Sequence, residues 1–168
     1  MNCLKLKQAA IIGWSDGAII GLDLAIHHPT RINKLFSFAA NSNPEGVNES
    51  VFKTAIFKDY VKRAETEYRQ LSTTPTQYQE FYNQIEHMGA TEPQFTEKQL
   101  KSIRVPVWVV DGDHDEAIKR KNTEYMAKMI PNAGLLIQPW VGHFALLQGP
   151  SQFTQDILNF LKSPDDVY

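Results

Sequence analysis

Cysteine is almost absent from this sequence of 168 residues, in which Cys3 is the only one. A single cysteine cannot form an internal disulfide, so the sequence has neither a disulfide framework nor a cysteine metal cluster. The histidine, aspartate and glutamate residues also lack the ligand spacing of a metal site. We therefore expect no metal and no other cofactor, and the lone thiol fits a reducing compartment.

Long apolar runs and charge of one sign are missing as well. No run approaches the roughly 20 residues of a membrane-spanning helix, and the N-terminus lacks the apolar stretch and cleavage site of a signal peptide. The 17 basic and 19 acidic residues give a net charge of −2, without a basic stripe that could displace counterions from nucleic acid. We therefore expect no membrane or nucleic-acid partner and a cytoplasmic location.

What is present is the composition of a globular protein, with 42% hydrophobic and 21% charged residues, in a chain that fits one domain. Four short apolar segments are predicted strands: Gln8–Ile12, Asn33–Ala39, Val105–Val110 and Gly134–Gln138. Three segments of helical spacing are predicted helices of the same unit: Ala18–His27, Glu116–Met129 and Phe153–Leu161. This alternation predicts an α/β fold, with about four parallel strands flanked by helices.

Residues 40–104 have a different character, because they show helical spacing and no strand signal. Three helices are predicted there: one over Phe52–Tyr68, one over Gln77–Met88 and a short one near Thr96–Ser102. We therefore divide the chain into a core, residues 1–39 and 105–168, and a helical insert, residues 40–104.

The residues Gly13-Trp14-Ser15-Asp16-Gly17 match the pattern G-x-S-x-G where the first predicted strand gives way to a helix. A serine on so sharp a turn has a strained backbone, and small residues two before and two after it avoid clashes. The backbone N–H of Asp16, at the helix start, would point toward a developing oxyanion. Ser15 is therefore a candidate nucleophile and Asp16 a candidate oxyanion donor; a simple helix N-cap is the alternative role for Ser15.

Polar loops follow two later strands at the same edge of the predicted sheet. Asp113 and Asp115 come after Val105–Val110, and His143 comes after the last strand. The carboxyl ends of parallel strands share one edge, so these side chains are expected to meet Ser15 there. A histidine could take the serine proton and return it to the leaving group, while a carboxylate orients the ring. Both aspartates are candidates for that carboxylate.

Gly13, Gly17 and Gly21 raise the alternative of a dinucleotide-binding turn. That turn requires G-x-G-x-x-G, which lets the backbone approach a pyrophosphate, and the sequence lacks this pattern. The sharp turn and close packing of a helix on the sheet explain these glycines better.

Serine, aspartate and histidine in this order, each after a separate strand, resemble the α/β-hydrolase family. Three parts of the sequence carry the resemblance: Ile12–Ala18 with Leu24–Pro29, Val105–Val107 with Asp111–Asp115, and Gly142-His143. It extends over almost the whole chain. The resemblance implies a partial α/β-hydrolase fold, in which residues 40–104 take the place of a helical lid over the pocket.

The resemblance also implies roles for the candidate residues. Ser15 is the nucleophile, His143 the general base and acid, and Asp115 the orienting acid, because the family places that acid three residues after Gly112. Three aromatic residues beside these positions are candidate substrate-binding residues of the pocket wall: Trp14, Trp140 and Phe144. The implied reaction is cleavage of a small ester or related acyl substrate through an acyl-enzyme. Other chemistry on this fold, such as cofactor-free peroxidation, is an alternative.

The family has several strands ahead of the one that carries the nucleophile, so about 100 residues are expected to be missing, with Met1–Lys7 the end of a preceding helix. The family takes its second oxyanion donor from an early loop, and no residue here can be assigned to it, so this chain is expected to be a fragment with reduced or no activity. Strand Gln8–Ile12 is expected to have an open edge. The alternative function is therefore a non-catalytic remnant that self-associates or binds a partner through this edge.

Overall fold

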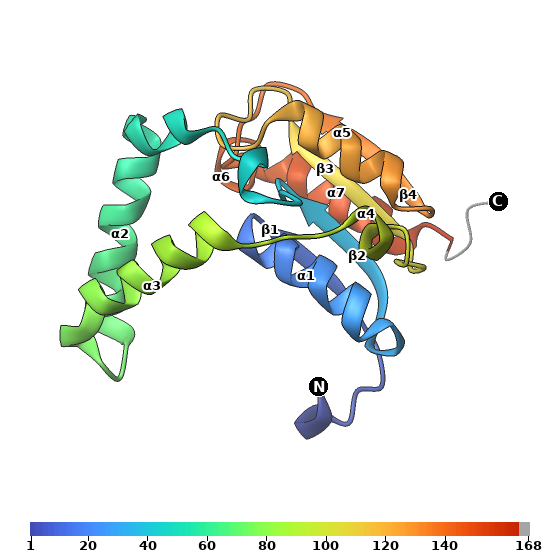
Figure 1. Cartoon of the computed structure of the whole chain (residues 1–168), viewed down its shortest axis with the longest axis horizontal. Coiled ribbons are helices and arrows are strands. Elements are labelled where there is room, and N and C mark those ends of the chain that lie inside the picture. The colour runs from blue at the N-terminus through green and yellow to red at the C-terminus, as the bar shows by residue number, and fades with distance from the viewer. Residues whose placement is uncertain (165–168) are drawn as a thin grey trace.

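The computed structural model describes residues 1–164, in which a parallel sheet is flanked by helices and a pair of helices projects to one side (Figure 1). Four strands form the sheet: β1 (Ala9–Trp14), β2 (Ile32–Phe38), β3 (Val107–Gly112) and β4 (Ala133–Gln138). Neighbouring strands pair in parallel in the order β1-β2-β3-β4. The predicted fold class, with about four parallel strands flanked by helices, is confirmed.

Helices cover both faces of the sheet. The helices that cover the sheet are mainly α1 (Asp16–His27), α5 (Arg120–Met129) and α7 (Pro150–Lys162). Successive side chains of a strand point to opposite faces, so Leu35 of β2 lies in the core with residues of α1 and α5, whereas Phe36 packs against Phe153 and Phe160 of α7. Burial on both faces agrees with the burial along the strands: every residue of β2 except Asn33, and every residue of β3 except Trp108, is buried.

The insert lies between β2 and β3. Its elements are the 3₁₀ helices η3 (Pro44–Gly46), η4 (Glu49–Lys53) and η5 (Pro75–Gln77) and the α-helices α2 (Ala55–Leu71), α3 (Tyr78–Thr91) and α4 (Glu97–Leu100). Helices α2 and α3 form the hairpin that projects in Figure 1, and the rings of Tyr68 and Phe81 stack between them with centroids 4.8 Å apart. Leu100 and Ile103 are fully buried in the core with α1 and α5, so the last part of the insert packs with the core.

Helix α5 begins at Arg120, and the prediction that it starts at Glu116 is wrong. The amides of Ala117 and Ile118 each donate a hydrogen bond of 2.7 Å to the Asp115 carboxylate. Ile118 also forms an antiparallel bridge with Val47 of the insert. These bonds compete with helix formation, so the segment 116–119 lies against the insert before the chain turns into α5.

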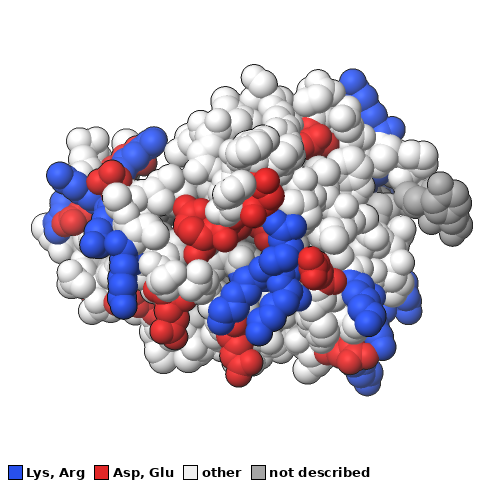
Figure 2. Space-filling view, turned by 90° about the horizontal axis from the view of Figure 1, so that it is seen from above, with Lys and Arg blue, Asp and Glu red and all other residues white. Residues whose placement is uncertain are grey.

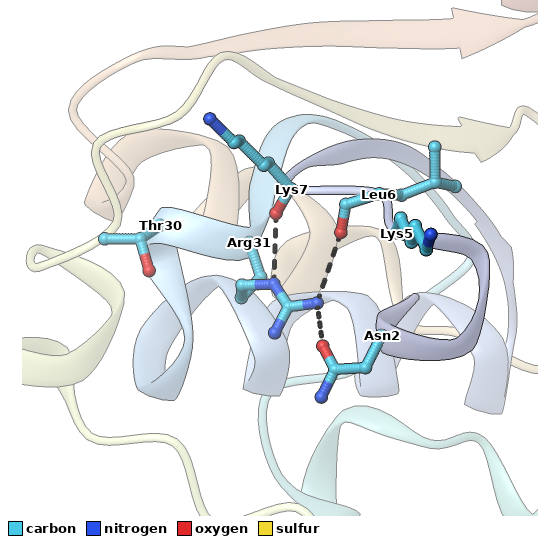
Figure 3. Close-up of a pocket in the computed structure, with 6 residues that line it drawn as sticks. All are labelled: Asn2, Lys5, Leu6, Lys7, Thr30 and Arg31. Carbon is cyan, nitrogen blue, oxygen red and sulfur yellow. Dashed lines mark hydrogen bonds between the residues drawn. The ribbon is translucent and has the colours of Figure 1, made fainter.

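The N-terminal segment also differs from the expected helix end, because it holds only a 3₁₀ turn, η1 (Asn2–Leu4). The guanidinium of Arg31 donates hydrogen bonds to the Lys7 carbonyl (3.0 Å) and to Asn2 Oδ1 (2.8 Å), beside a hollow of about 490 Å³ (Figure 3). These groups tie the segment to the loop after α1. Outside the insert, two further short helices were not predicted: η2 (Pro29–Arg31) and α6 (Ala145–Gln148).

Strands β1 and β4 are the edges of the sheet that residues 1–164 form, as expected for the first strand. The Ile12 side chain on β1 is 41% exposed and Leu135 on β4 is 48% exposed. On the face shown in Figure 2, basic side chains lie beside acidic ones. No helix within residues 1–164 has both the length and the hydropathy of a membrane span.

Candidate active site

Ser15 occupies the turn between β1 and α1 in a strained conformation, with φ 53° and ψ −123°. Residues other than glycine rarely adopt a positive φ, and such strain is typical of functional sites. A Cβ at Gly13 would lie 2.5 Å from both the Gly17 carbonyl oxygen and Ala18 Cα, so a side chain there would clash with backbone. At Gly17 a Cβ would meet no atom of residues 1–164 within 4 Å. The steric requirement for glycine therefore holds at the first position of the motif only.

Three side chains from three separate loops form a hydrogen-bonded row. His143 Nε2 lies 3.0 Å from Ser15 Oγ, and His143 Nδ1 lies 3.0 Å from Asp115 Oδ2. The histidine and aspartate side chains are only 7% and 2% exposed. The structure thus brings together the serine, histidine and carboxylate that sequence order predicted would meet at one sheet edge. In this geometry the ring can accept the serine proton at Nε2 while Nδ1–H donates to the carboxylate.

The Asp115 carboxylate is held in its charged form. Burial acts to raise its pKa, but the hydrogen bond with His143, the charge of that ring and the N–H of Ile118 outweigh burial and bring the pKa below its ordinary value. Its other oxygen, Oδ1, accepts the amides of Ala117 and Ile118, so the carboxylate cannot rotate freely. A fixed anion facing Nδ1 is the group needed to orient an imidazole and to stabilise its protonated form.

Asp113, the other candidate for the orienting acid, has a different partner. Its side chain pairs with His114 Nδ1 at 2.5 Å, and that hydrogen bond lowers the pKa of the Asp113 carboxyl. Trp140 stacks on the same His114 ring, with centroids 5.9 Å apart, and is 86% exposed. Asp115 is therefore the aspartate that contacts His143, and Trp140 belongs to a separate surface group with His114.

An aromatic cluster lies beside the row. The Trp14 ring lies 5.5 Å from the rings of both His143 and Phe144, and Tyr60 of α2 approaches Trp14 at 5.9 Å and Phe144 at 5.5 Å. Burial raises the pKa of the Tyr60 hydroxyl, and the negative charge of Asp16 adds to that effect. The sequence predicted Trp14 and Phe144 here. It gave Tyr60 only as part of a helical pattern, which could not show which helix face would meet the site.

A second carboxyl group lies behind Asp115 at the end of β3. Asp111 is fully buried, its Oδ1 accepts the Gly112 amide at 2.9 Å, and its Oδ2 accepts the Thr123 hydroxyl at 2.7 Å. Burial and the negative charge of Asp115 raise the pKa of Asp111 to about 8. Because two neighbouring carboxylates repel each other when both are charged, the pair carries one proton at neutral pH, and Asp111 holds it. The sequence signal that could have identified Asp111 is its position, a carboxylate directly after an apolar run of strand residues.

The start of α1 supplies a candidate oxyanion donor. Asp16 is the first residue of that helix, where a backbone N–H has no acceptor within the helix, and its neighbour Ser15 carries the hydroxyl. We assign no second donor among residues 1–164. Within the same residues, no group of three histidine, cysteine, aspartate or glutamate side chains is arranged to hold a metal ion.

Two surface hollows lie away from the hydrogen-bonded row. One is the hollow beside the N-terminal segment and Arg31. The other, of about 800 Å³, lies between the start of the insert and α5, and its lining includes Glu45, Glu49, Lys119 and Lys121. Neither is lined by a member of the row.

The known proteins to which this chain is similar are hydrolases. No protein-family model matches this chain. The sequence is 28% identical over 182 residues to the putative carbamate hydrolase RutD of a Caulobacter species, and 22% identical over 171 residues to the serine hydrolase BPHL of Homo sapiens. The fold is similar to that of the carboxylesterase CesB (YbfK) from Bacillus subtilis, with a TM-score of 0.66 and 20% identity.

The three matches differ in how much of the other protein they cover. Each includes 96% of this chain, but the share of the other protein is 68% for RutD, 57% for BPHL and 62% for CesB. The chain thus spans about three fifths to two thirds of the length of these relatives.

Proposed function

We propose that this chain is a serine hydrolase of the α/β-hydrolase type that cleaves a small ester or related acyl substrate through an acyl-enzyme on Ser15. The observation that carries the proposal is the row of Ser15 Oγ, His143 and Asp115, with both hydrogen bonds at 3.0 Å. The names of these relatives, a carbamate hydrolase, a serine hydrolase and a carboxylesterase, agree with hydrolysis of an acyl substrate.

The proposed reaction has two halves, acylation of Ser15 and hydrolysis of the acyl-serine, and the same residues act in both. Ser15 Oγ attacks the carbonyl carbon while its proton passes to His143 Nε2, and that proton then leaves with the alcohol or amine. Water then attacks the carbonyl carbon of the acyl-serine and gives a proton to the same nitrogen. The bond to Ser15 Oγ breaks, His143 returns the proton to that oxygen, and the acid is released. Asp115 stabilises the imidazolium in both halves, and the N–H of Asp16 donates to the oxyanion.

The insert supports a lid-like role in this proposal. Tyr60 reaches Trp14 and Phe144 from α2, so one wall of the substrate site would come from the insert and the other from the core. Phe144 is almost fully buried and supports the wall from behind, whereas Trp14 and Tyr60 are partly exposed and are the rings we assign to contact the acyl group. This arrangement favours an apolar acyl group over a charged one.

The test is covalent labelling of the purified chain by a fluorophosphonate. The serine oxygen bonds to phosphorus, fluoride leaves, and His143 takes the proton. We expect one adduct per chain by intact mass, mapped to Ser15 by peptide analysis and absent from Ser15→Ala. Labelling that persists in Ser15→Ala, or a wild-type chain that stays unlabelled over hours, would contradict the proposal.

A second candidate function is self-association through β1, and the edge position of this strand, with Ile12 exposed, favours it. We expect sedimentation velocity to show dimers whose fraction rises with concentration. Ile12→Lys should shift the chain to monomer, because a charge on an edge strand opposes pairing. Leu135→Lys on β4 is the matched control and should leave the distribution unchanged. A monomer at every concentration would exclude this candidate.

A further inference from the structure

We propose that Trp14 and Glu116 are positioning residues that hold the backbone of His143 from both sides and so fix its imidazole against Ser15. The indole N–H of Trp14 donates to the His143 carbonyl at 2.6 Å, and the His143 amide donates to Glu116 Oε2 at 3.0 Å. This inference rests on the proposed function, because it assigns how the base is held in place.

The two holding residues are the chain neighbours of the other two members of the row. Trp14 directly precedes Ser15, and Glu116 directly follows Asp115. Each bond therefore ties the histidine loop to the neighbour of the side chain that the imidazole must meet. A shift of either loop would carry the His143 backbone with it, which preserves the two 3.0 Å distances of the row.

The histidine loop needs such support, because the residues from Val141 to Phe144 lie between β4 and α6 and belong to no helix or strand. Its own sequence makes room for the contact. A Cβ at Gly142 would lie 2.4 Å from Glu116 Oε2 and 3.0 Å from the His114 carbonyl oxygen. Glycine at this position therefore allows the carboxylate to reach the amide of the next residue.

Trp14 is itself restrained by the aromatic cluster, because its ring packs against Phe144 and Tyr60. It thus acts as a bridge from the serine loop to the histidine loop. A misplacement of about 1 Å in a reacting group can cost roughly 100-fold in rate, so loss of either bond is expected to slow Ser15 acylation about 10- to 100-fold.

The experiment measures two quantities in the full chain: the rate of fluorophosphonate labelling at Ser15, and the NMR resonance of the His143 Nδ1 proton that lies toward Asp115. Trp14→Phe and Glu116→Ala should each slow labelling about 10- to 100-fold and shift or broaden that resonance. Glu116→Gln keeps an oxygen acceptor for the amide and should stay within about threefold of wild type. Trp108→Phe, which removes a tryptophan from β3, is the matched control and should change neither quantity.

The outcomes separate this inference from the proposed function. If wild type labels and both variants label at the wild-type rate, the positioning role is wrong and the proposed function stands. If wild type does not label, the proposed function fails, and the resonance alone decides: an unchanged signal in both variants overturns the positioning role. Thermal unfolding identifies a variant that does not fold. If Glu116→Ala is such a variant, Trp14→Phe decides, because it removes the indole N–H and keeps most of the bulk of the side chain.

Discussion

Replacing His143 with alanine is expected to slow fluorophosphonate labelling of Ser15 by about 10⁴-fold or more. The reason is that His143 Nε2 is the group that faces Ser15 Oγ, at 3.0 Å, and so is the acceptor for the serine proton. Without it the hydroxyl must lose its proton to water, and the oxygen remains a weak nucleophile. The measurement is the pseudo-first-order rate of adduct formation by intact mass.

The chain provides a matched control for this substitution. His114 belongs to the loop that carries Asp115 and also contacts an aspartate, Asp113, but it lies exposed on the surface with Trp140. His114→Ala should therefore label at the wild-type rate. Equal losses in His114→Ala and His143→Ala would show that the rate follows general damage to the sheet edge rather than proton transfer at Ser15.

The second large effect concerns stability and its dependence on pH. Asp111→Asn is expected to raise the free energy of unfolding by more than about 1 kcal/mol at pH 8, because burial and the neighbouring Asp115 charge raise the pKa of this carboxyl from 3.8 to about 8 on folding. The amide keeps an oxygen for the Gly112 N–H and gains an N–H that can donate to Asp115, whereas the Thr123 hydroxyl loses its acceptor, Oδ2. It also carries no charge to repel that carboxylate.

The sign follows from proton binding in the two states. Below about pH 4 Asp111 is protonated in both the folded and the unfolded chain, so the substitution does not raise the free energy of unfolding there. Between about pH 4 and pH 8 the unfolded chain releases this proton while the folded chain keeps it, so wild-type stability falls as pH rises. The free energy of unfolding of Asp111→Asn therefore exceeds that of wild type by an amount that grows from about pH 4 to about pH 8 and is constant above pH 8.

Urea unfolding of both chains from pH 5 to pH 8.5 measures this difference. Asp113→Asn is the control, because the pKa of Asp113 is lowered and its removal takes away a stabilising effect that is present above the ordinary carboxyl pKa. It should give no gain at pH 8. A difference between wild type and Asp111→Asn that stays flat with pH would refute the assignment of the buried proton to Asp111.

Much of the fold was predictable, because alternating apolar segments determine which residues can be strands of a buried parallel sheet. The meeting of Ser15, Asp115 and His143 followed from their positions after three such strands. Choosing Asp115 over Asp113 required the family resemblance, since both lie on one short loop. In the structure His143 contacts the former, whereas the latter pairs with its own neighbour, His114.

The rest depended on contacts between segments distant in sequence. The predicted start of α5 was wrong because the Asp115 carboxylate competes with helix formation for the next amides, which helical spacing does not reveal. Glu116 and Tyr60 approach the site from a loop and from α2, and nothing in their local sequence marks them. Trp140 was expected beside the site because of its position in the chain, but its backbone, with φ 64°, and its stacking on His114 place it on the surface.

The edge position of β1 has a consequence for how long the serine keeps its reactive geometry. The Ser15 amide donates to the Phe38 carbonyl at 2.9 Å, and β1 itself has a hydrogen-bonded neighbour within residues 1–164 on one side only, which is β2. Local separation of these two strands would let the strained φ relax without unfolding of the remaining sheet. Each local separation of this strand pair is expected to remove the reactive geometry, and hydrogen exchange at the β1 amides measures how often it occurs.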